Sequence, residues 1–211
     1  MLREFFVIAF AHQLAVMSPG PDFAMVSKIA LRNGKDAGRS AAMGIALGIA
    51  THITVSLIGF AALLKSNQTV FSSVRIIGAV YLAYIGYKSL SGGLQLRKSK
   101  HQGAGTQVVP ALSAHGAMYQ GYVTNITNPK ATLFFLTIFT QLVSRSTPVV
   151  GKLAYGTEMV VATFLWFWLV STCVNMAKVR RIYDRQAWKI ELVFGVVIIL
   201  IALVVIKEVV T

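Results

Sequence analysis

The chain has 211 residues, of which 55% are hydrophobic and only 13% are charged, and its mean hydropathy is +0.66. This composition is more apolar than that of a soluble domain, so it argues against a soluble enzyme and indicates a membrane protein with several spans. A net charge of +13 would suggest a nucleic-acid partner, but the basic residues lie between apolar segments rather than on one continuous face, so we expect no nucleic-acid binding.

Six apolar segments of about 20 residues or more follow one another along the chain. They predict an all-α polytopic membrane protein with six transmembrane helices in a single domain. The first segment has no clear cleavage signature, so we expect it to stay as a membrane helix. The sole cysteine, Cys173, lies in an apolar run, so we predict no disulfide, no metal site and no cofactor. The segments cover residues 5–27, 40–64, 69–91, 116–143, 153–177 and 188–207.

The first segment is interrupted by Ser18-Pro19-Gly20-Pro21-Asp22. Neither proline can donate a backbone hydrogen bond, and glycine adopts conformations closed to other residues, so we predict that the helix unwinds here. Hydrocarbon cannot solvate the backbone groups that such a break frees, so the break should be buried in protein or line a watery cavity. Freed carbonyls and the positive end of the next helix would then bind charged groups of a small molecule.

The second segment carries the pattern Gly44-x-x-x-Gly48, extended by Ala41 and Ala37. Small residues on one helix face let a neighbouring helix approach closely. The pattern therefore predicts close packing, either within the protomer or in a homodimer.

Residues 96–115 form the one soft, polar stretch and are predicted to be a linker between two halves of three segments each, residues 1–95 and 116–211. Thirteen of the 20 Lys and Arg residues lie in three connections on one side of the predicted membrane, and six lie on the other side. The positive-inside rule then places these basic loops and the linker in the cytoplasm and both termini outside. The thirteen residues are Lys28, Arg32, Lys35, Arg39, Lys88, Arg97, Lys98, Lys100, Lys178, Arg180, Arg181, Arg185 and Lys189.

The fourth segment is interrupted at Asn128-Pro129-Lys130, about half the chain length after the first break, with Asn125 and Thr127 close by. Because each half has an odd number of segments, the second half enters the membrane from the opposite side, so similarity between the halves makes an inverted repeat. We predict two inverted three-helix repeats that each open with a broken helix, an arrangement typical of transporters.

Four motifs occur in this order along the chain: residues 17–23 (MSPGPDF), 44–48 (GxxxG), 81–87 (YLAYIGY) and 121–131 (GxxxNxxNPKA). Together they resemble the lysine exporter / homoserine-threonine resistance (LysE/RhtB) family. The resemblance implies a multi-pass protein of the bacterial inner membrane that exports amino acids or close derivatives, of the threonine, homoserine or lysine type, using the proton gradient.

Asp22 and Lys130 follow the two breaks at the same relative position. A charge at a helix centre costs about 3 kcal/mol on insertion scales, so both side chains should face the interior or each other. As a pair at the membrane midplane they would bind a zwitterionic amino acid, with Asp22 on its ammonium and Lys130 on its carboxylate. The alternative is a structural salt bridge, with Asp22 capping the following helix. Ser18 either contacts the substrate or satisfies the loosened backbone.

Three titratable residues inside the predicted spans are candidates for a proton relay: His12, His52 and Glu158. Each has an ordinary alternative, because the histidines can be hydrogen-bonded packing residues and Glu158 a solvated acid near the outer interface. Glu191, at the cytoplasmic end of the sixth segment, is predicted to pair with a basic neighbour, Lys189 or Arg185.

These residues favour a secondary active exporter of a small zwitterionic amino acid, with alternating access around the two breaks, over an enzyme. A membrane-embedded hydrolase needs a nucleophile and a base, and Ser18 with His12 lacks an orienting acid or an oxyanion motif. A cation exporter of related architecture would need several acids in the membrane, where the candidates are Asp22 and Glu158. The expected partners are the amino acid and the lipid bilayer, and no catalytic residue is assigned.

Overall fold

The computed structural model describes residues 2–64, 68–98, 112–144, 146–174 and 176–210. Helices make up nearly all of these residues, and no strand occurs among them, so the predicted all-α class is confirmed for this part of the chain. The helices are α1 (Leu2–Met17), α2 (Pro21–Asn33), α3 (Lys35–Leu64), α4 (Gln68–Lys98), α5 (Ala114–Ile126), α6 (Pro129–Gln141), α7 (Val149–Cys173) and α8 (Ala177–Val210).

The helices follow each other in two series of similar lengths. α1 to α4 have 16, 13, 30 and 31 residues, and α5 to α8 have 13, 13, 25 and 34 residues. The first and fourth predicted segments thus each correspond to two short helices, which meet at the prolines that begin α2 and α6. That each pair crosses the membrane as one broken span remains a prediction.

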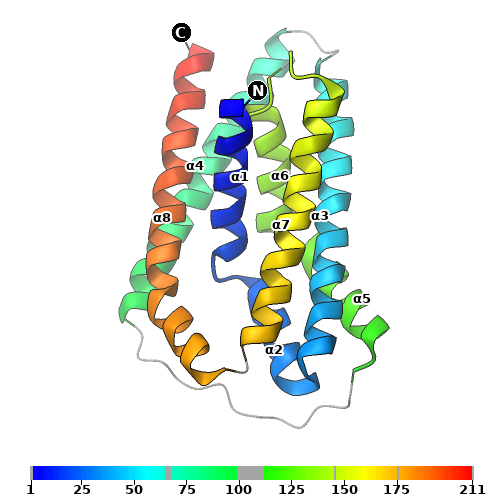
Figure 1. Ribbon diagram of the computed structural model, residues 1–211. Coiled ribbons are helices and arrows are strands. Elements are labelled where there is room, and N and C mark those ends of the chain that lie inside the picture. The colour runs from blue at the N-terminus through cyan, green and yellow to red at the C-terminus, as the bar shows by residue number, and fades with distance from the viewer. Residues whose placement is uncertain (1, 65–67, 99–111, 145, 175, 211) are drawn as a thin grey trace.

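The long helices form two pairs, with α3 packed against α7 and α4 packed against α8. α1 contacts α7 of one pair and α8 of the other, while α6 contacts α3 and α4. The short helices α1 and α6 therefore lie inside the bundle, between the two pairs of long helices (Figure 1). This arrangement brings the start of α6 close to the end of α1.

Glycines permit the closest helix contacts. A Cβ atom at Gly44 would lie 1.9 Å from the Met118 carbonyl oxygen, and one at Gly121 would lie 2.2 Å from the Ala41 carbonyl oxygen. The small-residue face of α3 thus packs against α5 within the same chain, which is the first of the two predicted uses of Gly44-x-x-x-Gly48.

Among the described residues, three helices are long and apolar enough to cross a membrane by themselves: Lys35–Gly59 of α3, Val149–Cys173 of α7 and Arg185–Lys207 of α8. The short helices have at most 16 residues, and 16 helical residues span only about 24 Å of a hydrocarbon core of about 30 Å. α4 is long enough but has a more polar sequence. Three of the six predicted spans are therefore supported directly by length and composition, and the other three remain predictions.

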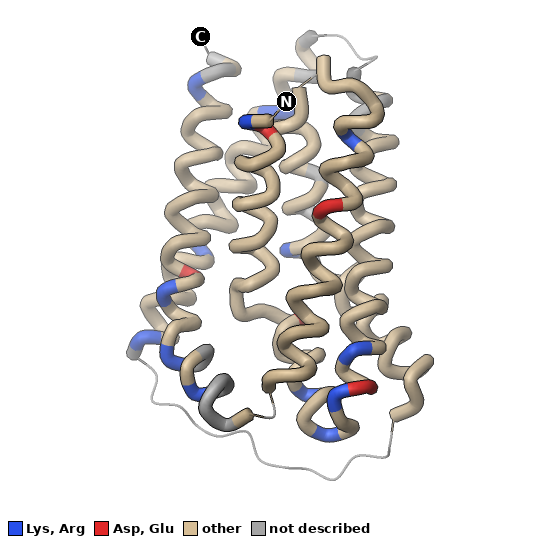
Figure 2. Tube along the Cα trace, in the orientation of Figure 1, with Lys and Arg blue, Asp and Glu red and all other residues tan. Residues whose placement is uncertain are grey.

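Basic residues are more frequent at one end of the bundle than at the opposite end, where α1 begins and α8 ends (Figure 2). The sequence predicted that these residues lie in loops, but most of those described belong to helix ends, because Lys and Arg are good helix formers. Only Gly34 separates α2 from α3, and its φ of +86° is accessible mainly to glycine. Lys65, Lys100, Arg145 and linker residues 99–111 lie outside the described residues, as do the side chains of Lys98, Lys178 and Arg180.

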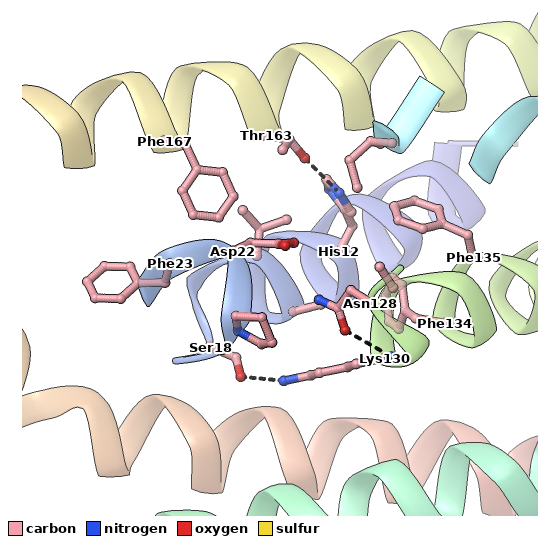
Figure 3. Close-up of a pocket in the computed structure, with 16 residues that line it drawn as sticks. His12, Ser18, Asp22, Phe23, Asn128, Lys130, Phe134, Phe135, Thr163 and Phe167 are labelled. Carbon is pink, nitrogen blue, oxygen red and sulfur yellow. Dashed lines mark hydrogen bonds between the residues drawn. The ribbon is translucent and has the colours of Figure 1, made fainter. Parts of the chain in front are cut away.

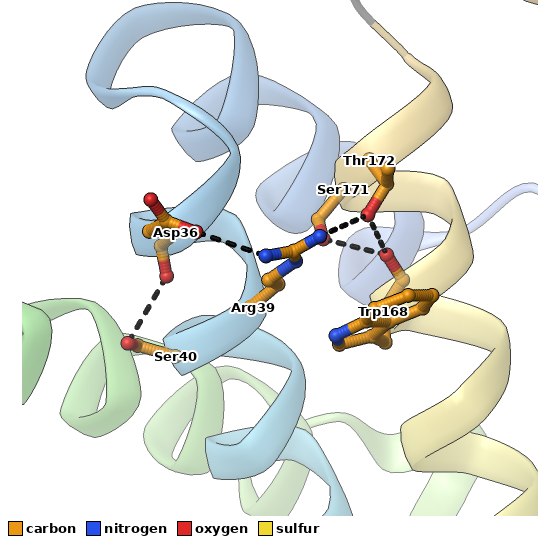
Figure 4. A network of polar contacts seen from close by, with 6 residues as sticks. All are labelled: Asp36, Arg39, Ser40, Trp168, Ser171 and Thr172. Carbon is orange, nitrogen blue, oxygen red and sulfur yellow. Dashed lines mark hydrogen bonds and ion pairs between the residues drawn. The ribbon is translucent and has the colours of Figure 1, made fainter.

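One basic residue at this end ties α3 to α7 (Figure 4). The Arg39 guanidinium donates to Asp36 at 3.0 Å and to the Thr172 hydroxyl at 3.3 Å, and it lies 4.7 Å from the centre of the Trp168 ring. Arg39 therefore stabilises the packing of the long helices in addition to contributing charge at this end.

Candidate functional site

A cavity of about 50 Å³ lies where the α1–α2 junction meets the start of α6 (Figure 3). Aromatic side chains form much of its wall, including Phe23, Phe134 and Phe167, none of which was predicted as part of the site. The space holds only a water molecule or two, so an amino acid fits only if the cavity widens. Seven predicted site residues line it: His12, Ser18, Gly20, Pro21, Asp22, Asn128 and Lys130.

Prolines end the helical path at the first junction. Pro21 is the first residue of α2, and Gly20 caps that helix with φ −159° and ψ −174°. This conformation is extended rather than left-handed, and a Cβ at Gly20 would meet only the Ser18 carbonyl oxygen, at 3.8 Å. The expectation that Gly20 uses a glycine-specific conformation is therefore wrong, because Pro19 and Pro21 are enough to prevent a continuous helix.

Polar side chains satisfy the backbone at the second junction. The Asn128 side chain is the N-cap of α6 and accepts a hydrogen bond from the Lys130 amide at 3.0 Å, which is a common cap geometry. The Thr127 hydroxyl donates to the Val123 carbonyl oxygen at 2.7 Å. Both side chains thus have local structural roles, and Asn128 lines the cavity as well.

Asp22 is linked to the second half of the chain through Asn125. The fully buried Asn125 donates from Nδ2 to Asp22 Oδ2 at 2.8 Å, and its backbone carbonyl oxygen lies 3.1 Å from His52 Nε2. Asp22 Oδ1 and Asn125 Oδ1 are buried and have no hydrogen-bond partner among the described residues. One carboxylate oxygen of Asp22 is therefore available to a ligand donor.

Lys130 is linked to α8 instead of to Asp22. Its Nζ atom donates to Ser18 Oγ at 2.6 Å, Ser18 Oγ donates to Glu191 Oε1 at 2.6 Å, and Nζ lies 3.9 Å from Glu191 Oε1. In Figure 3, Asp22 lies on the side of His12 and α7, while Lys130 extends toward α8. The predicted direct Asp22–Lys130 pair is therefore wrong, because each side chain has a nearer partner, although both line one cavity.

Glu191 is a site residue that the sequence interpretation missed. It is 6% exposed and contacts Ser18 and Lys130, so the predicted pairing with Lys189 or Arg185 is wrong. The sequence did indicate an inward position, because Glu191 lies at helical spacing from the buried residues of α8 and so shares their face. Those buried residues are Ala187, Phe194, Ile198, Ala202 and Val205.

The rings of both histidines lie next to the ring of Phe135. His12 is completely buried, lines the cavity and has its Nε2 atom 3.2 Å from the Thr163 hydroxyl, while its Nδ1 has no partner among the described residues. The His52 ring stacks on Phe135 with centroids 5.9 Å apart and lies outside the cavity lining. Glu158 on α7 also lies outside the lining, so His12 is the relay candidate that lines the same cavity as Asp22.

Comparison with known proteins places the chain among translocators. The family model described as LysE type translocator matches residues 14–208. The chain is 29% identical to the threonine efflux protein of Escherichia coli K12, over 89% of each chain. It is 34% identical to the leucine efflux protein of Salmonella choleraesuis, over 74% of this chain and 73% of that protein. It is also 30% identical to the E. coli K12 membrane protein YahN, over 98% of this chain and 87% of that protein. No solved structure matches it. With the family model covering nearly the whole chain, this protein belongs to the LysE type translocator family.

Proposed function

We propose that the protein is a secondary active exporter of a small zwitterionic amino acid across the bacterial inner membrane. Family membership and the names of the threonine and leucine efflux relatives support amino-acid export. The observation that carries the proposal is that Asp22 and Lys130, one from each junction, line a single cavity. Opposite charges in an otherwise largely apolar lining suit a molecule that carries both an ammonium and a carboxylate.

The ammonium of the substrate binds Asp22, whose Oδ1 has no protein donor among the described residues, and the carboxylate binds Lys130. The first turns of α2 and α6 add backbone N–H groups near the same cavity. Because these contacts use groups that every amino acid has, the side-chain preference would be set by the aromatic wall.

Alternating access follows from two inverted three-helix repeats that move relative to each other around the junctions. The repeated order of two short and two long helices supports this architecture. The excess of Lys and Arg at one bundle end supports a cytoplasmic position for that end and for the linker, with both termini outside. The small cavity is then a narrow state that must widen during transport.

Proton coupling is assigned to His12 together with Asp22. His12 is buried beside the cavity, and its Nδ1 has no partner among the described residues, so one ring nitrogen is open to accept or donate a proton. His52 reaches the same carboxylate through Asn125 and is a second relay candidate. Glu158 has the weakest support of the three, because it lies outside the cavity lining and, unlike His52, it has no hydrogen-bonded link to Asp22 among the described residues.

A hydrolase role deserves comparison because Ser18 and Lys130 are in contact. The Ser18 hydroxyl donates to the Glu191 carboxylate, and Lys130 donates to Ser18, so the lysine is arranged as a cation and not as a general base. His12 contacts Thr163 instead of Ser18. These contacts favour a binding site over a nucleophilic one.

The test is an efflux assay in cells loaded with a panel of dipeptides. Expression of the wild type should speed the exit of at least one amino acid, and Asp22→Asn should abolish that effect although the protein still inserts. The matched control is Asp36→Asn, which makes the same chemical change at a side chain that is 81% exposed. No enhanced export of any amino acid would overturn the proposal, and faster exit of alkali cations alone would favour the cation-exporter alternative.

A further inference from the structure

Glu191 connects α8 to both junctions. The residue is 6% exposed, and its carboxylate accepts a hydrogen bond from the Ser18 hydroxyl at 2.6 Å, with Lys130 Nζ at 3.9 Å from the same oxygen. Ser18 belongs to the first junction and Lys130 to the first turn of α6. One acid on α8 thus holds groups from the two parts of the chain that form the proposed transport site.

The start of α6 favours a nearby anion. Lys130 places a positive charge within the first turn, at the end where the helix dipole is also positive, which is electrostatically unfavourable without a counter-charge. Asp22 has the reverse relation to α2, because a negative charge at a helix N-terminus is favourable. The Ser18 hydroxyl and the Lys130 ammonium are the side-chain donors at this place, and Glu191 is the carboxylate that they hold.

A substrate carboxylate needs the same donors. On the proposed function, Lys130 binds the carboxylate of the amino acid from the cavity, which both Lys130 and Ser18 line. Glu191 Oε1 already interacts with both groups, while Glu191 Oε2 has no partner among the described residues. Two carboxylates cannot both be held by one buried ammonium without repulsion, so they compete.

We propose that Glu191 is an internal competitor for the substrate, whose carboxylate occupies the same donors, Ser18 Oγ and Lys130 Nζ, that an exported amino acid must take. This inference rests on the proposed function and adds to it a regulatory contact within the site. When the amino acid binds, Glu191 leaves Lys130, and the polar link from α8 to the α1–α2 junction and α6 opens. Substrate binding therefore releases α8 from the rest of the site.

The contact of Glu191 with Lys130 also lowers the affinity for the amino acid. The amino acid must displace a carboxylate that is attached to the same chain, so binding is weaker than the bare Lys130 site would allow. Weak binding favours release, which an exporter requires on the outer side. Removing the charge of Glu191 should therefore strengthen the binding of acids and leave ligands without a carboxylate unaffected.

The experiment measures calorimetric binding of L-threonine, L-leucine and their amides, L-threoninamide and L-leucinamide, to the purified full chain in lipid nanodiscs. Glu191→Gln keeps the size of the side chain and removes its charge, and it should raise the affinity for at least one amino acid about tenfold, a difference of about one charge-assisted hydrogen bond. The affinity for the corresponding amide should change less than about twofold. Asp36→Asn is the matched control and should change neither affinity.

Two further measurements keep the inference testable if Glu191→Gln does not fold. Glu191→Asp shortens the side chain and should raise amino-acid affinity by a smaller factor. In the wild type with ¹³C-labelled glutamate carboxyl groups, infrared difference spectra should show a shift of a carboxylate band when the amino acid is added and no shift with the amide. Unchanged or weaker amino-acid binding by Glu191→Gln, or no band shift, would overturn the inference alone. If neither amino acid binds the wild type or any variant, the proposed function is overturned, and this inference with it.

Discussion

The two junctions of the bundle are built alike but differ in charge. Each begins its second helix with a proline, and each places a charged residue one position later, Asp22 in α2 and Lys130 in α6. The Asp22 charge suits the positive end of its helix, whereas the Lys130 charge opposes it. The first junction is therefore electrostatically complete within its own helix, and the second depends on an anion from elsewhere, which in this structure is Glu191.

The two junctions also differ in capping. Gly20 caps α2 without a side-chain hydrogen bond, whereas Asn128 caps α6 through its side chain. The second junction is thus held by a local cap and by a long-range ion pair. Substitutions that break these contacts should lower stability more than substitutions at the first junction.

The largest effect is expected from Lys130→Ala. The substitution leaves the buried Glu191 carboxylate without its cation, which costs about 3–5 kcal/mol of folding free energy, and it removes the proposed carboxylate site. Thermal unfolding in detergent should show a clearly lower Tm, and efflux should disappear. The double variant Lys130→Met with Glu191→Leu should recover most of the lost stability, because an ion pair replaced by packed apolar groups is often neutral, but it should not recover efflux. An unchanged Tm in Lys130→Ala would contradict the dependence of the second junction on its ion pair.

A smaller effect on stability is expected from Asn125→Ala, which removes a contact with Asp22 of the first junction. The change removes the donor to Asp22 Oδ2 but keeps the backbone carbonyl that faces His52, so it isolates one contact. Leaving a buried carboxylate oxygen without its donor costs about 1–3 kcal/mol. The check is again the Tm, with Thr127→Ala as the neighbouring control, expected within about 0.5 kcal/mol of the wild type because this residue is exposed. Equal losses of stability in Asn125→Ala and Thr127→Ala would mean that the Asn125–Asp22 contact makes no specific contribution to stability.

The smallest effect is expected from exchanging the caps. Asn128→Gly should lower stability and Gly20→Asn should raise it, each by less than about 1 kcal/mol, because asparagine is a better N-cap than glycine. Gly20 accepts a side chain in principle, since its φ of −159° is extended and its surroundings are open. Paired unfolding curves of the single variants and of the double exchange measure the difference. A loss of stability in Gly20→Asn would indicate a steric limit at the first junction that the backbone geometry does not show.

The positions of the junctions could be predicted because they depend on local chemistry. Pro19, Pro21 and Pro129 prevent a continuous helix wherever they stand, and the helix ends fall beside them. Asp22 and Lys130 could be assigned to one site because charges inside an apolar segment must face the protein interior. Both residues line the cavity.

The partners of these charges could not be predicted from local chemistry. Glu191 lies 61 positions beyond Lys130 in the sequence. Its basic neighbours in the chain suggested an ion pair at the surface. Only its helical spacing from the buried residues of α8 indicated that it faces the interior. The contacts Asn125–Asp22 and His12–Thr163 join distant helices, and a single sequence contains no information on which helix faces meet. Local rules thus identified residues that line one cavity, and the packing of the helices decided which residues contact them.

The central claim is that Asp22 and Lys130 bind the two charged ends of an exported amino acid. It is tested most directly by transport of radiolabelled L-threonine and L-leucine in proteoliposomes that contain the purified protein, with and without a pH gradient. The wild type and Asp36→Asn should transport at least one of the two faster with the gradient, and Asp22→Asn should show no transport above empty liposomes. Transport by Asp22→Asn at the wild-type rate would contradict the claim.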